Sequence, residues 1–186
     1  LMQTTGALIA PLTLTVMLML SAIAHCDERP LNYIEYSSQL SSSGQPTEAQ
    51  FSMLAKAGFE RVFYLAFADD DGALANEDRV ARDLGMQFVQ LPVVWAKPEL
   101  RDFDMFAAAM AQNESQKTLV HCQLNWRASS FVFLYRVLYQ GVAMDDAFLD
   151  MRSVWSPSKA WQDFIFSVLA AHQVSPDCAL CDWQEN

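Results

Sequence analysis

The sequence predicts an α/β domain with a central, mostly parallel sheet flanked by helices. Three short apolar runs bounded by turn residues alternate with segments whose apolar residues repeat at helical spacing. Strands that alternate with helices form sheets covered on both faces, and ligands of such sheets bind beyond the carboxyl ends of the strands. With 186 residues, 52% of them hydrophobic, the chain suits one domain with its own core.

The N-terminal segment predicts export. Residues 1–24 contain no charged side chain and end in Ala22-Ile23-Ala24. An apolar stretch that closes with small residues is typical of a secretory signal peptide. We therefore expect residues 1–24 to be a signal peptide cleaved before His25, and the mature protein to be periplasmic or otherwise exported. The alternative is a retained N-terminal membrane anchor.

The rest of the chain, residues 25–186, is expected to form a single domain, with a core at about 35–172 and a cysteine-containing tail at 173–186. Residues 25–46 are rich in loop formers and end in a turn cluster. Apolar periodicity and turn signals then predict strands at 61–67, 87–91 and 118–121, and helices at 47–58, 76–84, 103–110, 127–139, 145–154 and 158–172.

Charge limits the partners. The chain has 12 basic and 22 acidic residues, a net charge of −10, which argues against non-specific nucleic-acid binding. A phosphate can still be held locally by backbone amides, a helix N-terminus and one arginine. We expect a phosphorylated protein or small molecule as partner, no nucleic acid, no stable membrane partner after cleavage, and neither cofactor nor metal.

The most informative segment runs from His121 to Ser129, between an apolar strand and an apolar helix. A tight turn into a helix N-terminus offers amides to an anion, and the guanidinium of Arg127 could grip two of its oxygens. The same positive surroundings favour a thiolate at Cys122. Attack on phosphorus would give a phosphocysteine, which water hydrolyses without a metal. The residues expected to bind substrate are His121, Gln123, Leu124, Asn125, Trp126, Ala128 and Ser129.

This loop resembles that of the protein tyrosine and dual-specificity phosphatases, in which His-Cys is followed by five residues, Arg, and then Ser or Thr. Here four residues separate Cys122 from Arg127. That spacing, with Ser43-Gly44-Gln45-Pro46 before a helix, is similar to the bacterial tyrosine-phosphatase-like family, which includes the phosphatase-like domain fused to some β-lactamase-type hydrolases. The resemblance covers about residues 35–170. It implies a dual-specificity-like fold, with Cys122 as nucleophile, Arg127 as phosphate ligand, and His121 shaping the loop and the thiolate.

Two positions depart from that pattern. Asn125 stands where the family loop usually has Gly. Asn is the non-glycine residue that best tolerates a positive φ. Ser129 follows Cys122 by seven residues but does not directly follow Arg127. Either the loop is one residue shorter, or it keeps its length and the arginine has moved. Only the second arrangement leaves Ser129 free to hydrogen-bond the cysteine sulfur.

The resemblance also implies an aspartate general acid on the loop after the preceding strand, yet no Asp stands near the start of that loop. Asp102 is the first choice and Glu99 the second, because both lie at the start of the next helix and could face the site. The alternative is that both only favour the positive helix N-terminus. The acidic cluster Asp69 to Asp71 could also lie at the carboxyl end of a strand and reach the site, but a solvated loop or weak cation binding is the preferred interpretation.

Two other functions remain open. Rhodanese-type sulfurtransferases also have a catalytic Cys followed, after four residues, by Arg or Thr, although His121 and the Ser43 to Pro46 segment favour the phosphatase group. A catalytically weak, anion-binding pseudophosphatase is the other alternative. Trp95 and Trp126 could line an aromatic pocket.

The tail holds Cys178 and Cys181, beyond the last apolar helix. In an exported protein we expect a disulfide, either between these two residues or between one of them and Cys26. Zinc bound by His25, Cys26, Cys178 and Cys181 is a less favoured alternative.

Overall fold

The computed structural model describes residues 29–184, so the expected signal peptide and its cleavage site lie outside the described residues. The sheet has the strand order β1-β2-β5-β3-β4. Its strands are β1 (Ile34–Ser37), β2 (Leu40–Ser43), β3 (Arg61–Tyr64), β4 (Gln87–Gln90) and β5 (Thr118–His121). Only β1 runs antiparallel to its neighbour, and the pairs β2·β5, β5·β3 and β3·β4 are parallel. The mostly parallel sheet is thus confirmed.

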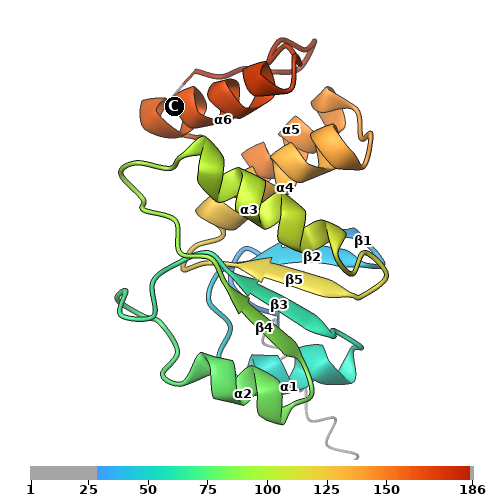
Figure 1. Ribbon diagram of the computed structural model, residues 1–186, viewed down its shortest axis with the longest axis vertical. Helices are drawn as coiled ribbons and strands as arrows, with labels where there is room; N and C mark the ends of the chain where they lie inside the picture. Colours follow the sequence, from blue (N-terminus) through green and yellow to red (C-terminus); the bar gives the residue numbers. More distant parts are fainter. Residues whose placement is uncertain (1–28, 185–186) are drawn as a thin grey trace, which may run out of the picture.

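Helices cover both faces of this sheet, as expected. The pair α1 and α2 lies on one face, and α3 to α6 lie on the other (Figure 1). The bounds are α1 (Glu48–Lys56), α2 (Glu77–Asp83), α3 (Leu100–Ala111), α4 (Trp126–Tyr139), α5 (Met144–Val154) and α6 (Lys159–Ala171). Each of the six predicted helices is present within a few residues of its expected bounds.

The first helix begins where the sequence places its cap. The Gln50 amide donates to the Thr47 hydroxyl at 3.2 Å, and the Thr47 amide donates to the Gln50 side-chain oxygen at 2.9 Å. This reciprocal pair satisfies two of the amides that a helix start leaves unpaired. The cap therefore fixes where the chain from β2 turns into α1.

The interpretation of residues 25–46 as mainly loop was wrong, because β1 and β2 form a hairpin there. Serine has little preference for strands, but β2 pairs with β5 and is fully buried. Its hydroxyls are satisfied: Tyr33 and Ser41 are hydrogen-bonded at 2.9 Å, and Tyr36 and Ser42 at 2.7 Å. Long-range pairing therefore makes a strand of a segment whose local signals indicate a turn.

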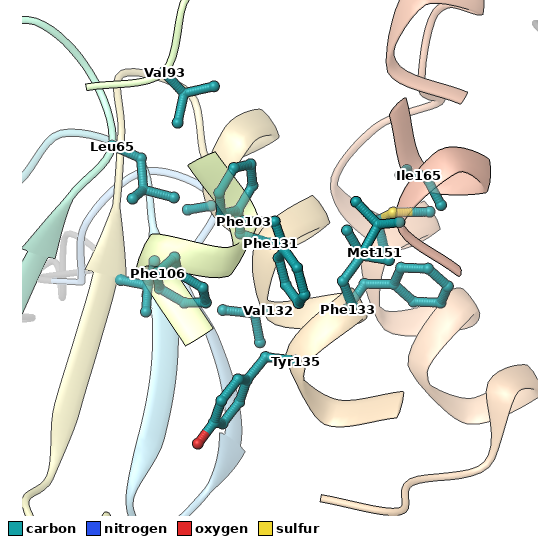
Figure 2. Packing of buried hydrophobic residues seen from close by; sticks show 14 of the residues in the cluster. Leu65, Val93, Phe103, Phe106, Phe131, Val132, Phe133, Tyr135, Met151 and Ile165 are labelled. Atoms are coloured by element: carbon teal, nitrogen blue, oxygen red, sulfur yellow. The ribbon is translucent and has the colours of Figure 1, made fainter. Parts of the chain in front are cut away.

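Helix α4 passes through the middle of the domain, as its all-round apolar sequence predicts. It contacts α3, α5 and α6 as well as β2 and β5. Phe106 of α3 packs edge-on against Phe131 of α4, with ring centroids 5.5 Å apart, and Met151 and Ile165 close the core from α5 and α6 (Figure 2). The N-terminus of α4 and the end of β5 are therefore anchored in the core.

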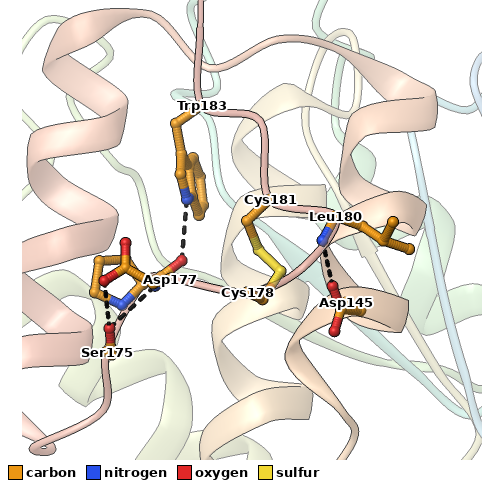
Figure 3. The surroundings of a disulfide bond; sticks show 8 residues. Asp145, Ser175, Asp177, Cys178, Leu180, Cys181 and Trp183 are labelled. Atoms are coloured by element: carbon orange, nitrogen blue, oxygen red, sulfur yellow. Dashed lines mark hydrogen bonds between the residues drawn. A yellow bond between two sulfur atoms is a disulfide. The ribbon is translucent and has the colours of Figure 1, made fainter.

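The tail packs against the helices through a disulfide and a tryptophan. Cys178 and Cys181 are bonded to each other, which is the local option among the expected pairings (Figure 3). The Leu180 amide donates to Asp145 at 2.6 Å, and Trp183 packs on Phe148 with centroids 4.7 Å apart.

Within residues 29–184, no helix has both the length and the apolar character needed to cross a membrane.

Candidate active site

Cys122 lies at the bottom of a small cavity where β5 turns into α4. It is 1% exposed, and it is the free cysteine of the described part of the chain. Asn125 makes the turn with a left-handed backbone at φ 69°, as its sequence position predicts. The cavity measures about 220 Å³. Its lining residues are Trp95, Cys122, Gln123, Leu124, Trp126 and Arg127.

The backbone of this loop turns its carbonyls outward. The Gln123 carbonyl accepts the Gln45 amide at 3.0 Å, and the Leu124 carbonyl accepts the Asn32 side-chain amide at 3.0 Å. In a trans peptide the next N–H points the opposite way, so the Leu124 amide faces away from Gln45. The amides of Leu124, Trp126 and Arg127 have no hydrogen-bond acceptor among residues 29–184. Unpaired amides at a helix N-terminus can bind an anion.

Arg127 is held in place from several sides and keeps one unused donor. It is 6% exposed; Nη1 donates to Gln123 Oε1 at 2.7 Å, and Nη2 lies 3.4 Å from Asp70 Oδ2. Its guanidinium lies over the Trp95 ring at 5.5 Å. The buried Nε has no hydrogen-bond partner among the residues described. A fixed guanidinium with a free donor beside Cys122 suits an oxyanion.

Asp70 is the carboxylate that the fold brings to Arg127. It lies on the connection between β3 and α2, where it also accepts the Phe67 amide at 3.3 Å. The next residue is also tied to the site, because Gln123 Nε2 donates to the Asp71 carbonyl at 3.3 Å. The interpretation as a solvated loop is therefore wrong for Asp70. Its place at the end of a strand next to β5 was the signal that could have favoured it.

The structure does not bring Asp102 or Glu99 into the cavity with Cys122. The Glu99 amide donates to the Asp102 carboxylate at 3.0 Å, so the two residues cap α3. Asp102 lines a separate cavity with Gln90, Leu91, Pro92 and Met105. A hydrogen bond and charge from Lys97, with the charge of Arg101, lower the pKa of Glu99, which disfavours the protonated form that a general acid needs. The structure thus supports the alternative, a helix-start role.

Four of the loop residues expected to bind substrate are buried and do not line the cavity: His121, Asn125, Ala128 and Ser129. The Ser129 hydroxyl donates to the Trp126 carbonyl at 3.2 Å, inside α4, rather than to the cysteine sulfur. This bond, with α4 already beginning at Trp126, favours the alternative in which the loop is one residue shorter. The other three expected residues, Gln123, Leu124 and Trp126, line the cavity.

An aromatic wall borders the cavity. Trp95 comes from the loop after β4, and its ring centroid lies 5.6 Å from Trp126, 5.5 Å from Trp155 and 5.1 Å from Trp161. The Trp161 indole donates to the Trp95 carbonyl at 3.1 Å, which fixes this loop against α6. Trp95 and Trp126 therefore line the pocket as the sequence suggested, and they give it an apolar side.

A buried cysteine after the central parallel strand, with an arginine in the first turn of the next helix, defines a cysteine phosphatase fold of the dual-specificity type. Residues 24–164 match the family model described as "DSP-PTPase phosphatase fused to NAD+ Kinase". The chain belongs to this family of phosphatases.

Solved structures agree with this assignment. An inferred phosphatase (DUF442) from Shewanella putrefaciens CN-32 is 34% identical, with a TM-score of 0.71, over 77% of this chain and 92% of that one. The core catalytic domain of the PP-IP phosphatase SIW14 from S. cerevisiae, in complex with citrate, has 18% identity and a TM-score of 0.62 over 74% and 85% of the two chains. PTPMT1 in complex with PI(5)P has 15% identity and a TM-score of 0.64 over 75% and 96%. The last two show the shared fold alone. No curated protein matches the chain.

Proposed function

We propose that this phosphatase hydrolyses phosphate monoesters through a phosphocysteine on Cys122. The observation that carries the proposal is the set of donors from Leu124 to Arg127 that have no acceptor among residues 29–184, namely three loop amides and the buried Arg127 Nε. A phosphoryl group in the cavity would satisfy all of them. The test is hydrolysis of p-nitrophenyl phosphate by the full chain with a chelator present. We expect turnover without added metal, and none at any pH would contradict the proposal.

The chemistry needs only groups that the site supplies. The Cys122 thiolate attacks phosphorus, so a sulfur–phosphorus bond forms while the bond to the ester oxygen breaks. Arg127 and the loop amides stabilise the charge on the equatorial oxygens. The leaving oxygen takes a proton from a nearby acid. Water then gives a proton to the conjugate base of that acid and attacks phosphorus, the sulfur–phosphorus bond breaks, and inorganic phosphate leaves the restored thiolate.

Asp70 is our candidate for that acid. Its carboxylate lies 3.4 Å from Arg127 and therefore at the edge of the anion site. It replaces Asp102 and Glu99 in this role, because it contacts Arg127, whereas those two residues cap α3.

Replacing Asp70 with Asn tests this role through the leaving group. A poor leaving group needs the proton more than a good one. We expect Asp70→Asn to lower kcat about 100-fold for phenyl phosphate and clearly less for p-nitrophenyl phosphate, in parallel steady-state assays. Asp69→Asn, on the same loop, is the matched control and should leave both rates unchanged. Equal losses on the two substrates would remove Asp70 from this role.

A weakly active phosphate-binding protein is the second candidate. Asp70 contacts Arg127 and so competes with phosphate for the guanidinium. Calorimetric binding of inorganic phosphate without turnover of any aryl phosphate would favour this candidate. The sulfurtransferase alternative has no comparable support, since the family model and the related structures are phosphatases. An assay of sulfur transfer from thiosulfate to cyanide, run beside the phosphatase assay, checks it.

Export is proposed together with this function. It is supported by the uncharged apolar segment at residues 1–24 and by the disulfide between Cys178 and Cys181, a bond that persists in oxidising compartments. N-terminal sequencing of the mature protein should begin at His25. A mature chain that retains residues 1–24 would indicate the membrane-anchored alternative.

A further inference from the structure

A buried polar cluster supports the anion loop from below, and the mechanism above does not use it. It consists of Gln45, from the β2–α1 connection, Glu77, at the start of α2, and His121, at the end of β5. Glu77 is 5% exposed and His121 is fully buried. His121 Nε2 lies 2.7 Å from Glu77 Oε1, and Gln45 Nε2 donates to Glu77 Oε2 at 2.5 Å.

The charge of Glu77 has one ion-pair partner among residues 29–184, and that partner is His121. The two atoms are at ion-pair distance, although they are not aligned as a hydrogen bond. A buried carboxylate without a cation is costly. An imidazolium at His121 would compensate that charge. It would place a positive charge on the residue that precedes Cys122.

The cluster also reaches the far side of the loop. Gln45 donates its side-chain amide to Glu77 and its backbone amide to the Gln123 carbonyl at 3.0 Å. The backbone packs closely here, because a Cβ on Gly44 would lie 2.7 Å from the Gln123 oxygen. Glu77 thus connects to the loop on both sides of the nucleophile, through His121 and through Gln45.

The surroundings of His121 contain few other ionisable groups. Tyr64 of β3 stacks on the imidazole with centroids 4.7 Å apart, and Phe51 of α1 packs edge-on at 6.0 Å. Burial first, and then the negative charges of Glu77, Asp70 and Cys122, raise the pKa of Tyr64, so its phenol stays neutral. Arg127 acts on the same phenol in the opposite direction and lowers its pKa. Glu77 is therefore the carboxylate placed to stabilise a positive charge on the imidazole.

We propose that Glu77 is a positioning residue that keeps His121 protonated and, through Gln45, holds the loop, so that Cys122 is available as a thiolate. The effect of Glu77 on turnover rests on the proposed function. Its effect on the ionisation of the Cys122 thiol does not, because alkylation measures that ionisation without any phosphatase activity. In the described structure Glu77 makes no hydrogen bond or ion pair with Cys122, so its influence passes through its neighbours.

The test follows iodoacetamide alkylation of the Cys122 peptide against pH, by mass spectrometry of the full chain. Glu77→Gln keeps the size of the side chain and removes its charge, so under the proposal His121 loses its second proton and the residue before Cys122 loses its positive charge. We expect the pH midpoint of alkylation to rise by about one unit. Glu77→Asp keeps the charge, so its midpoint should lie close to that of the wild type. Asp78→Asn is the matched control, since Asp78 pairs with Arg82 on the exposed side of α2.

The outcomes separate this inference from the proposed function. A raised midpoint in Glu77→Gln supports the inference even if the wild type turns over no substrate, in which case only the proposed function fails. An unchanged or lower midpoint in a folded Glu77→Gln protein overturns it. If that variant does not fold, His121→Asn removes the imidazolium directly and is expected to give the same rise. An unchanged midpoint there also overturns the inference.

Discussion

Replacing Cys122 with Ser is expected to lower p-nitrophenyl phosphate turnover by at least about 10⁴-fold, because a serine hydroxyl at this site does not ionise near neutral pH. Cys122 lines the cavity and is the free cysteine among residues 29–184, so no other described thiol can replace it. Steady-state kinetics measure the loss. Binding of inorganic phosphate, measured by calorimetry, should persist, since Arg127 and the loop amides remain.

The control for this variant is the double substitution Cys178→Ser and Cys181→Ser. These residues are bonded to each other and line no part of the cavity. The double variant should keep its turnover, with some loss of thermal stability. Substantial turnover by a folded Cys122→Ser protein would contradict the assignment of the nucleophile.

Replacing Arg127 with Lys is expected to lower kcat/KM about 10³-fold, which corresponds to about 4 kcal/mol. Lysine keeps the positive charge, but it cannot hold Gln123 and Asp70 while offering the phosphoryl group another donor. The lysine ammonium also lacks the planar guanidinium that lies over the Trp95 ring in the wild type. Full progress curves at several substrate concentrations measure kcat and KM separately, and we expect the larger change in kcat.

Arg82→Lys provides the comparison for this variant. Arg82 is exposed on α2, where it pairs with Asp78. We expect its kcat/KM to stay within about two-fold of the wild type. An Arg127→Lys protein with nearly normal kcat/KM would mean that a point charge is enough and that the fork geometry plays no part.

The parts of the site that are local in sequence could be predicted. The segment from Cys122 to Arg127 is one turn between a buried strand and a buried helix, so its spacing alone indicates an anion loop. The positive φ of Asn125 followed from residue type in the same way. The fold class followed from the alternation of strands and helices, which needs no knowledge of how the strands are ordered.

The parts that depend on strand order could not be predicted. β5 lies between β2 and β3, so the residues that follow those two strands, Gln45 and Asp70, flank Cys122. β4 is an edge strand, and the loop after it reaches the site with Trp95 rather than with an acid. Position along the chain therefore favours Asp102 as the acid, but Asp102 lies beside the end of β4 and not beside Cys122. The buried serines of β2 were missed for a related reason, since their partners are distant in sequence.

The central claim is that the phosphoryl group passes through the sulfur of Cys122. The most direct measurement is mass spectrometry of the protein rapidly denatured during turnover of p-nitrophenyl phosphate. We expect one phosphoryl group on the peptide that contains Cys122 in the wild type, and none on that peptide in Cys122→Ser. Steady turnover with no adduct on Cys122, or with the adduct on another residue, would contradict this account.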